Sequence, residues 1–304
     1  MSTEPATSTE PRRDQHGHRS DHSRRSPRRG RAPLVPTAIL LLGTFYCLIP
    51  LAWVVMASTK SGSELFTTFT FWPGSGLLEN VGELTAHREG LYWRWMANSA
   101  LYAGLGAFLS ALLSCLTGFA LAKYRFPGRT ALFNILLAGV LVPPIMLAVP
   151  QFLLFAEVGL TNSYLSVLLP SVVSPFGIYL ARVYAAASVP DSLLEAARTE
   201  GAGELRVFWK VALPIMLPGL VTVFLFQFVA IWNNFLLPYI LLSDDGKFPV
   251  TVGLYTLLNQ GASQPVLYTL VITGSLLSVI PLIALFLSLQ RFWRIDLLSG
   301  AVKS

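Results

Sequence analysis

Long uncharged stretches alternate with short charged segments along the chain. Six stretches lack Asp, Glu, Lys and Arg, at residues 32–59, 95–122, 130–156, 158–181, 211–243 and 248–290. A helix of about 20 apolar residues crosses the hydrocarbon core of a bilayer, so each stretch can hold a span. In lipid, a helix satisfies its backbone hydrogen bonds within one segment. The pattern predicts an all-α, polytopic membrane protein with six transmembrane helices, near residues 34–57, 98–121, 131–154, 161–181, 215–240 and 268–290.

The last uncharged stretch, at 43 residues, is long enough for two spans. Its first part reads FPVTVGLYTLLNQGASQP and ends in polar residues, Gly and Pro. These residue types favour turns over the centre of a bilayer. We therefore expect a loop or a short interfacial helix there, followed by a single span.

Positive charge is distributed unevenly between the two sides that six spans define. Of the 22 Lys and Arg residues, 18 lie in residues 1–31, 123–129, 182–210 and 291–304, and the other four lie in the alternate segments. Loops rich in Lys and Arg stay in the cytoplasm, so both termini are expected there. The net charge of +6 therefore reflects membrane topology, and no nucleic-acid partner is expected.

Composition supports the same class and divides the chain into two regions. Hydrophobic residues make up 53% of the sequence and charged residues only 12%, about half the charged share of a soluble domain. Residues 1–31 are rich in Arg, Ser and Pro, so we expect a disordered basic cytoplasmic tail. Residues 32–304 are expected to form the six-helix transmembrane domain, in direct contact with the lipid bilayer.

Signatures of catalysis and cofactor binding are absent from the sequence. It contains no G-x-x-x-x-G-K-[ST] phosphate-binding loop, and three of its four His residues lie in the tail, leaving His87 alone. No metal site, cofactor or catalytic residue is therefore expected, and the chain does not resemble an enzyme. The predicted spans also lack the ionisable residues that ion-coupled carriers use. If this protein moves a solute, the energy comes from another molecule.

One charged strip interrupts the apolar pattern in the predicted cytoplasmic loop between spans four and five. It reads EAARTEGAGELRVFWKVALP, residues 195–214, within a loop that we place at 188–214. Ser188 is the expected N-cap of a first helix, and Gly201 its expected C-terminal cap. Leu193, Leu194 and Ala197 share one face, and Glu195 can pair with Arg198 at i, i+3.

A second helix is expected after Gly201. Its apolar positions recur at helical spacing, namely Leu205, Phe208, Trp209, Ala212 and Leu213. Pro214 and Pro218 then bend the chain into the fifth span. The first helix exposes the small residues Ala196 and Ala197 beside charged ones, which allows another protein to approach closely. The alternative is an ordinary amphipathic loop without a partner.

The strip resembles the EAA loop of permease subunits of binding-protein-dependent ABC importers. That pattern is E-A-A, three residues, G, nine residues, then I-x-L-P. Glu195, Ala196, Ala197, Gly201, Leu213 and Pro214 match it, and Val211 replaces the Ile. The flanking FGIYLARVYAAASVPDSLLEAARTEGA, FVAIWNNFLLPYILL and RFWRIDLLSGAVKS resemble the carbohydrate-uptake, maltose-type branch. The resemblance covers residues 34–304.

The resemblance implies partners and a location. In that family the loop inserts into a cleft on a separate cytoplasmic ATPase subunit, so Glu195 to Arg198, Gly201, Leu213 and Pro214 would form an ATPase-coupling loop. It also implies a second permease subunit, as a homodimer or heterodimer, and an extracytoplasmic solute-binding protein. The chain would be a multi-pass protein of the bacterial cytoplasmic (inner) membrane, with cytoplasmic termini.

The fifth predicted span offers a candidate substrate path. Gln227 and Asn234 are seven residues apart, which places them about 20° apart around a helix. Trp232 and Asn233 lie nearby on other faces. These side chains could line a polar passage for a sugar. Alternatively, the amides form interhelical hydrogen bonds and Trp232 is an interfacial anchor.

Three interpretations of function remain at this stage. The first is import of sugars or oligosaccharides by an ATP-driven, binding-protein-dependent system. The second is import of another solute, such as a peptide or polyamine, by the same machinery. The third is a membrane docking or assembly subunit that transports nothing.

Overall fold

The computed structural model describes residues 34–261 and 266–301. The chain divides into two units, residues 1–48 and 49–304. Helix α1, Leu34–Ser58, crosses the boundary between them. The tail predicted at 1–31 lies outside the described residues. Within the described residues all regular structure is helical, which confirms the predicted all-α class.

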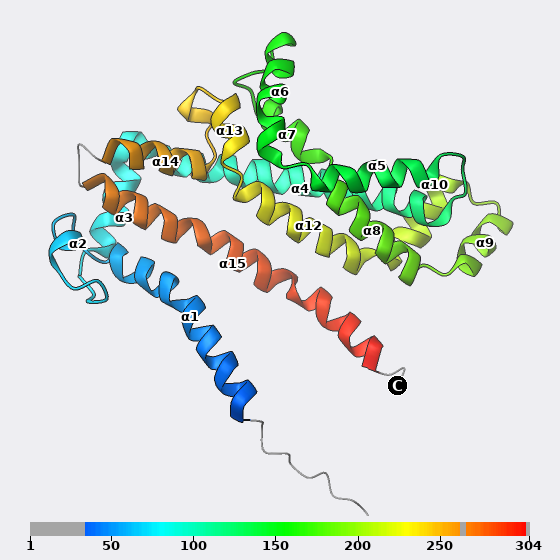
Figure 1. Cartoon of the computed structure of the whole chain (residues 1–304), viewed down its shortest axis with the longest axis horizontal. Helices are drawn as coiled ribbons and strands as arrows, with labels where there is room; N and C mark the ends of the chain where they lie inside the picture. The colour runs from blue at the N-terminus through cyan, green and yellow to red at the C-terminus, as the bar shows by residue number, and fades with distance from the viewer. Residues whose placement is uncertain (1–33, 262–265, 302–304) are drawn as a thin grey trace, which may run out of the picture. The chain divides into compact units, whose positions relative to one another are not determined.

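The second unit is a succession of long apolar helices joined by short ones (Figure 1). Its helices after α1 are α2 Glu64–Thr67, α3 Leu77–Ala86, α4 Leu91–Lys123, α5 Arg129–Leu141, α6 Pro144–Glu157, α7 Tyr164–Val172, α8 Pro175–Ser188, α9 Asp191–Thr199, α10 Glu204–Val207, α11 Leu213–Ile215, α12 Leu217–Trp232, α13 Leu236–Leu241, α14 Val250–Gly261 and α15 Val266–Ala301. Short η segments lie at His87–Gly90, Phe208–Ala212 and Asp245–Lys247.

Four stretches of the described chain are long and apolar enough to cross a membrane unaided. They are Val35–Ser58, Leu77–Lys123, Tyr164–Ser188 and Val266–Phe292. Two bent pairs, α5 with α6 and α10–α11 with α12, bring the number to six if each pair is one span. Each of these six segments overlaps one of the six predicted spans, although several of their ends differ. The short helix expected before the last span is α14.

The third predicted span is not one straight helix. Helices α5 and α6 meet at an angle of 102°, and the break falls at Val142 and Pro143, which are both extended. Consecutive prolines at 143 and 144 explain the break, because a residue before proline is driven out of the helical region and proline donates no backbone hydrogen bond.

The fifth predicted span, 215–240, ends earlier than expected, and the bend predicted at its start is present. Helix α12 begins at Leu217 after a bend of 80° and ends at Trp232. Asn233 forms its C-terminal cap, and consecutive Asn residues favour such an ending because their side chains compete for backbone groups. The fourth predicted span is too short at its end, since α8 continues to Ser188 and the prediction ended at residue 181.

Helix α4 forms the centre of the second unit and packs against both α8 and α12. Small residues allow this, because Gly118 lies directly against the backbone of Ala181. Around the contact lies a buried cluster that includes Cys115, Phe119 and Ala185. Figure 1 shows α9 and α10 together at one end of these helices and α14 at the other. The coupling loop is therefore attached to the end of the central bundle.

Candidate functional site: a coupling loop and a neutral cavity

The predicted coupling loop folds as two short helices anchored in the protein core. Leu194 of α9 and Phe208 after α10 are each only 2% exposed, and Val207 is fully buried. All three belong to the cluster that contains Phe119 of α4, and the rings of Phe119 and Phe208 lie 5.5 Å apart. The loop is therefore packed directly against the central helix α4.

Gly201 ends the first helix, as predicted. Its φ is +83°, in the left-handed region that glycine adopts without steric cost. Its N–H donates to the carbonyl of Arg198 at 2.9 Å, and the N–H of Ala202 donates to that of Ala197 at 3.0 Å. This pair of bonds is the Schellman arrangement, which satisfies the last carbonyls of a helix. The chain turns sharply here because the residue at 201 has no side chain.

The start of the first helix differs from the prediction. Ser188 is the last residue of α8, and its hydroxyl donates to the carbonyl of Tyr184. Helix α9 instead begins at Asp191, with Pro190 in the capping position. The sequence V-P explains the shift, because a residue before proline favours an extended backbone and Val189 has one.

The buried face of the second helix is also different. The buried residues are Val207, Phe208, Ala212 and Met216, whereas Leu205 is 71% and Trp209 47% exposed. A π-helical turn at Phe208–Ala212 changes the register, so a regular 3.6-residue period gives the wrong face. On α9, Leu193 is likewise 47% exposed rather than buried with Leu194. The loop therefore presents large apolar side chains to its surroundings.

An ion pair closes the turn between α9 and α10. Arg198 Nε lies 2.9 Å from Glu204 Oε1, and Arg198 also donates through a second nitrogen to Oε2. The hydroxyl of Tyr124 donates to the same Oε2 at 2.6 Å. The predicted pairing of Arg198 with Glu195 is therefore wrong, because the turn at Gly201 brings Glu204 closer. Glu195 is left exposed.

These contacts hold the carboxylates of the loop in their charged form. Hydrogen bonds from Arg198 and then Tyr124 lower the pKa of Glu204. The pKa of Asp191 is lowered chiefly by Lys123, whose Nζ lies 2.8 Å from Asp191 Oδ1. Both groups are therefore ionised at neutral pH, and the end of α4 is tied to both helices of the loop. Tyr124, Lys123 and Glu204 were missed in the sequence because their partners are distant along the chain.

The remaining residues of the EAA pattern lie on the outer side of the loop or at its bend. Ala196 is exposed, and Ala197 is half-buried against the core cluster. Leu213 is half-buried and Pro214 exposed in α11, just before the 80° bend into α12. The pattern thus includes both the turn at Gly201 and the junction with a bundle helix.

A separate cavity of about 380 Å³ lies beside the end of α12. Its lining combines aromatic rings, hydroxyls, an amide and aliphatic side chains, from Trp232, Asn233, Phe235, Val250, Thr251, Leu254, Tyr255, Leu258, Val271, Ser275, Ser278, Val279 and Leu282. Not one of these residues is an acid or a base. The rings of Phe235 and Tyr255 meet edge-to-face at 4.7 Å. The cavity is therefore suited to a neutral molecule with apolar faces and hydroxyl groups.

The four candidate path residues are distributed differently from the sequence prediction. Asn233 and Trp232 line this cavity, although Trp232 is only 3% exposed and stacks on Phe228. Gln227 lies elsewhere and donates to the Ser174 hydroxyl at 2.7 Å, which is an interhelical hydrogen bond. Asn234 lies beyond the end of α12, so the expected shared face with Gln227 is wrong.

Eleven of the thirteen cavity residues were missed by sequence reasoning, among them Phe235, Tyr255, Ser275 and Ser278. The serines lie at i, i+3 on α15, which is the one signal that could have indicated them. Their position opposite α12 and α14 depends on packing between distant segments.

The long apolar helices define a polytopic helical membrane protein. Residues 110–294 match the family described as "Binding-protein-dependent transport system inner membrane component". This chain belongs to that family, which confirms the resemblance seen in the sequence. It is therefore an integral, multi-pass permease component of the inner membrane rather than an enzyme.

Similar proteins cover most of the chain. The arabinooligosaccharides transport system permease protein AraQ of Halalkalibacterium halodurans is 34% identical over 262 residues, covering 85% of this chain and 92% of that protein. The diacetylchitobiose uptake system permease protein NgcG of Streptomyces coelicolor is 29% identical, covering 84% and 83%. In fold, the chain is similar to a bacterial ABC transporter involved in the import of alginate, with a TM-score of 0.73 and 24% identity, covering 85% of this chain and 95% of that one.

Proposed function

We propose that this permease subunit imports a neutral oligosaccharide, powered by ATP hydrolysis on separate cytoplasmic subunits. The observation that carries the proposal is the coupling loop, in which Leu194 and Phe208 are buried in the bundle while Glu195 and Ala196 remain exposed. The exposed residues of such a loop would offer a docking surface to another subunit, and its buried residues would transmit force to the helical bundle. Membership of a transport family argues against a mere docking subunit.

The proposed complex contains ATPase subunits at the coupling loop, a second permease subunit and an extracytoplasmic binding protein. Family membership supports the binding protein, since the family is described as binding-protein-dependent. The excess of Lys and Arg on one side supports an orientation with both termini and the coupling loop in the cytoplasm. The ATPase would contact Glu195 to Arg198, with Gly201, Leu213 and Pro214 setting the geometry.

Carbohydrate as the solute is supported by two independent observations. Relatives such as AraQ and NgcG are named for oligosaccharide transport. The cavity beside Asn233 and Trp232 combines aromatic rings with hydroxyls and has no charged lining residue. Sugars bind through hydroxyl hydrogen bonds and stacking of their apolar faces on aromatic rings. A polyamine or a phosphorylated solute would leave a charge unpaired there, at a high cost in desolvation.

Charge reversal at Glu195 tests the docking surface. Glu195→Lys is expected to reduce recovery of the ATPase with the tagged permease by about tenfold, the loss expected for one charge-assisted hydrogen bond. Recovery is measured by quantitative mass spectrometry of complexes purified in mild detergent. Glu79→Lys, an equal charge change at an exposed site on α3, serves as the control. Equal recovery of ATPase with both variants would contradict docking at Glu195.

Removing one aromatic ring tests the cavity as part of the substrate path. Tyr255→Ala is expected to lower the initial rate of uptake about tenfold, since stacking contacts of this kind contribute about 1 kcal/mol or more. Tyr255→Phe preserves the ring and should remain near the wild-type rate. The solute is first identified by thermal-shift screening of the partner binding protein against oligosaccharides. Equal rates for Ala and Phe variants would exclude the ring from the path.

A further inference from the structure

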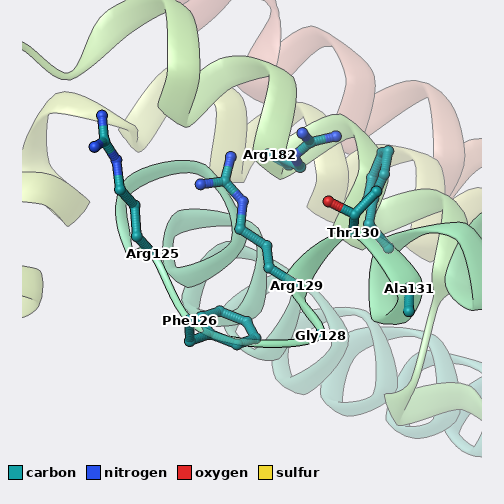
Figure 2. Close-up of a pocket in the computed structure, with 8 residues that line it drawn as sticks. Arg125, Phe126, Gly128, Arg129, Thr130, Ala131 and Arg182 are labelled. Atoms are coloured by element: carbon teal, nitrogen blue, oxygen red, sulfur yellow. The ribbon is translucent and has the colours of Figure 1, made fainter.

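Three arginines lie beside the first turn of α5, and within the described residues none of them forms a salt bridge. Arg125, Arg129 and Arg182 line one hollow of about 430 Å³, together with Phe126, Gly128, Thr130, Ala131 and Phe133. Figure 2 shows the side chains of Arg125 and Arg129 extending in the same direction from the turn, with Arg182 reaching in from α8. A second hollow of about 450 Å³ shares Arg129 and Arg182.

Within the described residues, no acid makes a salt bridge to these arginines. The ion pairs within 4.0 Å in residues 34–261 and 266–292 involve other cations. Asp191 is bound to Lys123 and attracts Arg125 more weakly, without a salt bridge. Arg129 donates to the carbonyl of Tyr124, and the guanidinium of Arg182 lies 3.7 Å from the centre of the Phe133 ring. Both side chains are therefore held in place around the hollow, and neither charge is paired with a carboxylate of the described residues.

The local backbone adds to the positive potential. Helix α5 begins at Arg129 with no acidic residue in its first turn and no side-chain cap. A helix N-terminus carries a partial positive charge, so cations are normally disfavoured there and anions favoured. An anion in the hollow would offset the repulsion between these arginines and the helix end. Arginine is also the side chain best matched to phosphate oxygens.

The surroundings of the hollow indicate where the anion comes from. Leu132 and Ile135 on α5, and Tyr179 and Val183 on α8, are exposed apolar side chains next to the arginines. An isolated phosphate ion would make no apolar contacts with this surface, whereas the acyl chains of a phospholipid would pack against it. The hollow also lies at the end of α4 that carries the coupling loop, which the proposed orientation places at the cytoplasmic leaflet. Basic pockets between helices on that side suit anionic lipid headgroups.

We propose that Arg125, Arg129 and Arg182 form a binding site for the phosphate headgroup of an anionic phospholipid. The lipid would lie against α5 and α8, with its headgroup at the first turn of α5. Because Tyr124 and Lys123 connect this turn to α9 and α10, a bound lipid would also brace the coupling loop. The location of the lipid rests on the proposed orientation of the permease, but its binding can be measured without any transport.

Native mass spectrometry of the full-length chain, purified with its associated subunits and delipidated, tests the site. Phosphatidylglycerol should bind more tightly than phosphatidylcholine. Arg129→Gln with Arg182→Gln should weaken phosphatidylglycerol binding about tenfold, whereas Arg206→Gln with Lys210→Gln, two exposed cations of the neighbouring loop, should leave it unchanged. Arg125→Gln provides a second variant, since within the described residues its side chain makes no hydrogen bond that folding would lose.

Three kinds of result would overturn the proposal. The first is equal binding of the two lipids, or equal loss in both double variants. The second is binding of inorganic phosphate at the arginines as tight as that of phosphatidylglycerol, which would identify a free-anion site. The third is protection of residues 125–133 by another subunit in hydroxyl-radical footprinting, which would identify a protein partner. Because uptake is not the readout, failure here is distinguishable from failure of the transport proposal.

Discussion

Gly201→Pro is expected to abolish solute uptake while the chain still inserts into the membrane. The φ of +83° at this position is outside the range of a proline ring, which fixes φ near −65°. Proline also removes the N–H that donates to the carbonyl of Arg198. The turn between α9 and α10 would reform in another geometry, separating Arg198 from Glu204. The expected cost of about 3 kcal/mol corresponds to about a 100-fold loss of the correctly folded loop.

Two controls separate the turn from a general effect of substitution. Gly203→Pro places the same residue two positions further on, where φ is −70° and a Cβ meets nothing within 4 Å. It should transport near the wild-type rate. Gly201→Asn should retain much of the activity, because Asn tolerates the left-handed conformation. Uptake into cells is measured against the amount of permease in the membrane fraction. Wild-type uptake by Gly201→Pro would rule out the turn as a coupling element.

Gly118→Ala is expected to destabilise the helical bundle. An added Cβ would lie 2.6 Å from the backbone nitrogen of Arg182 and 2.8 Å from the carbonyl carbon of Ala181. Because these are backbone atoms of α8, the clash cannot be relieved by rotating a side chain. Overpacking of this kind typically costs about 1–3 kcal/mol. The measurement is thermal unfolding of the purified chain in detergent.

A second glycine on the same helix provides the matched control. A Cβ at Gly104 of α4 meets nothing within 4 Å. Gly104→Ala should therefore leave stability unchanged or raise it by up to about 1 kcal/mol, since Ala has the higher helix propensity. The two substitutions add the same methyl group, and only Gly118→Ala should lower the melting temperature. A lower melting temperature for Gly104→Ala alone would contradict the packing of α4 on α8.

The sequence predicted the features that depend on local composition. Hydrophobic stretches located the four long apolar segments and the two bent pairs that can cross a membrane. Gly201 was identified as a helix end because few other residues accept its backbone conformation. The EAA spacing located the loop and the family. These features could be predicted because each is determined by residues that are close together along the chain.

The predictions that were wrong concern features that depend on breaks in helical periodicity or on partners distant along the chain. The π turn at Phe208–Ala212 shifted the buried face, so Leu205 and Trp209 were wrongly placed in the core. Helix α12 ended at Trp232, which separated Asn234 from Gln227. The pairing of Arg198 with Glu204 needed the turn geometry in addition to the sequence. The cavity formed from α12, α14 and α15 could not be predicted without their packing.

Reconstitution into proteoliposomes tests most directly whether the coupling loop transmits force from another subunit. We expect uptake only when the permease is present with its ATPase, its binding protein and any second permease subunit, and when ATP is supplied. Omitting ATP, or introducing Gly201→Pro into the full complex, should reduce uptake to the level of empty vesicles. Transport of the same solute by the purified chain alone, without nucleotide or other subunits, would contradict this account.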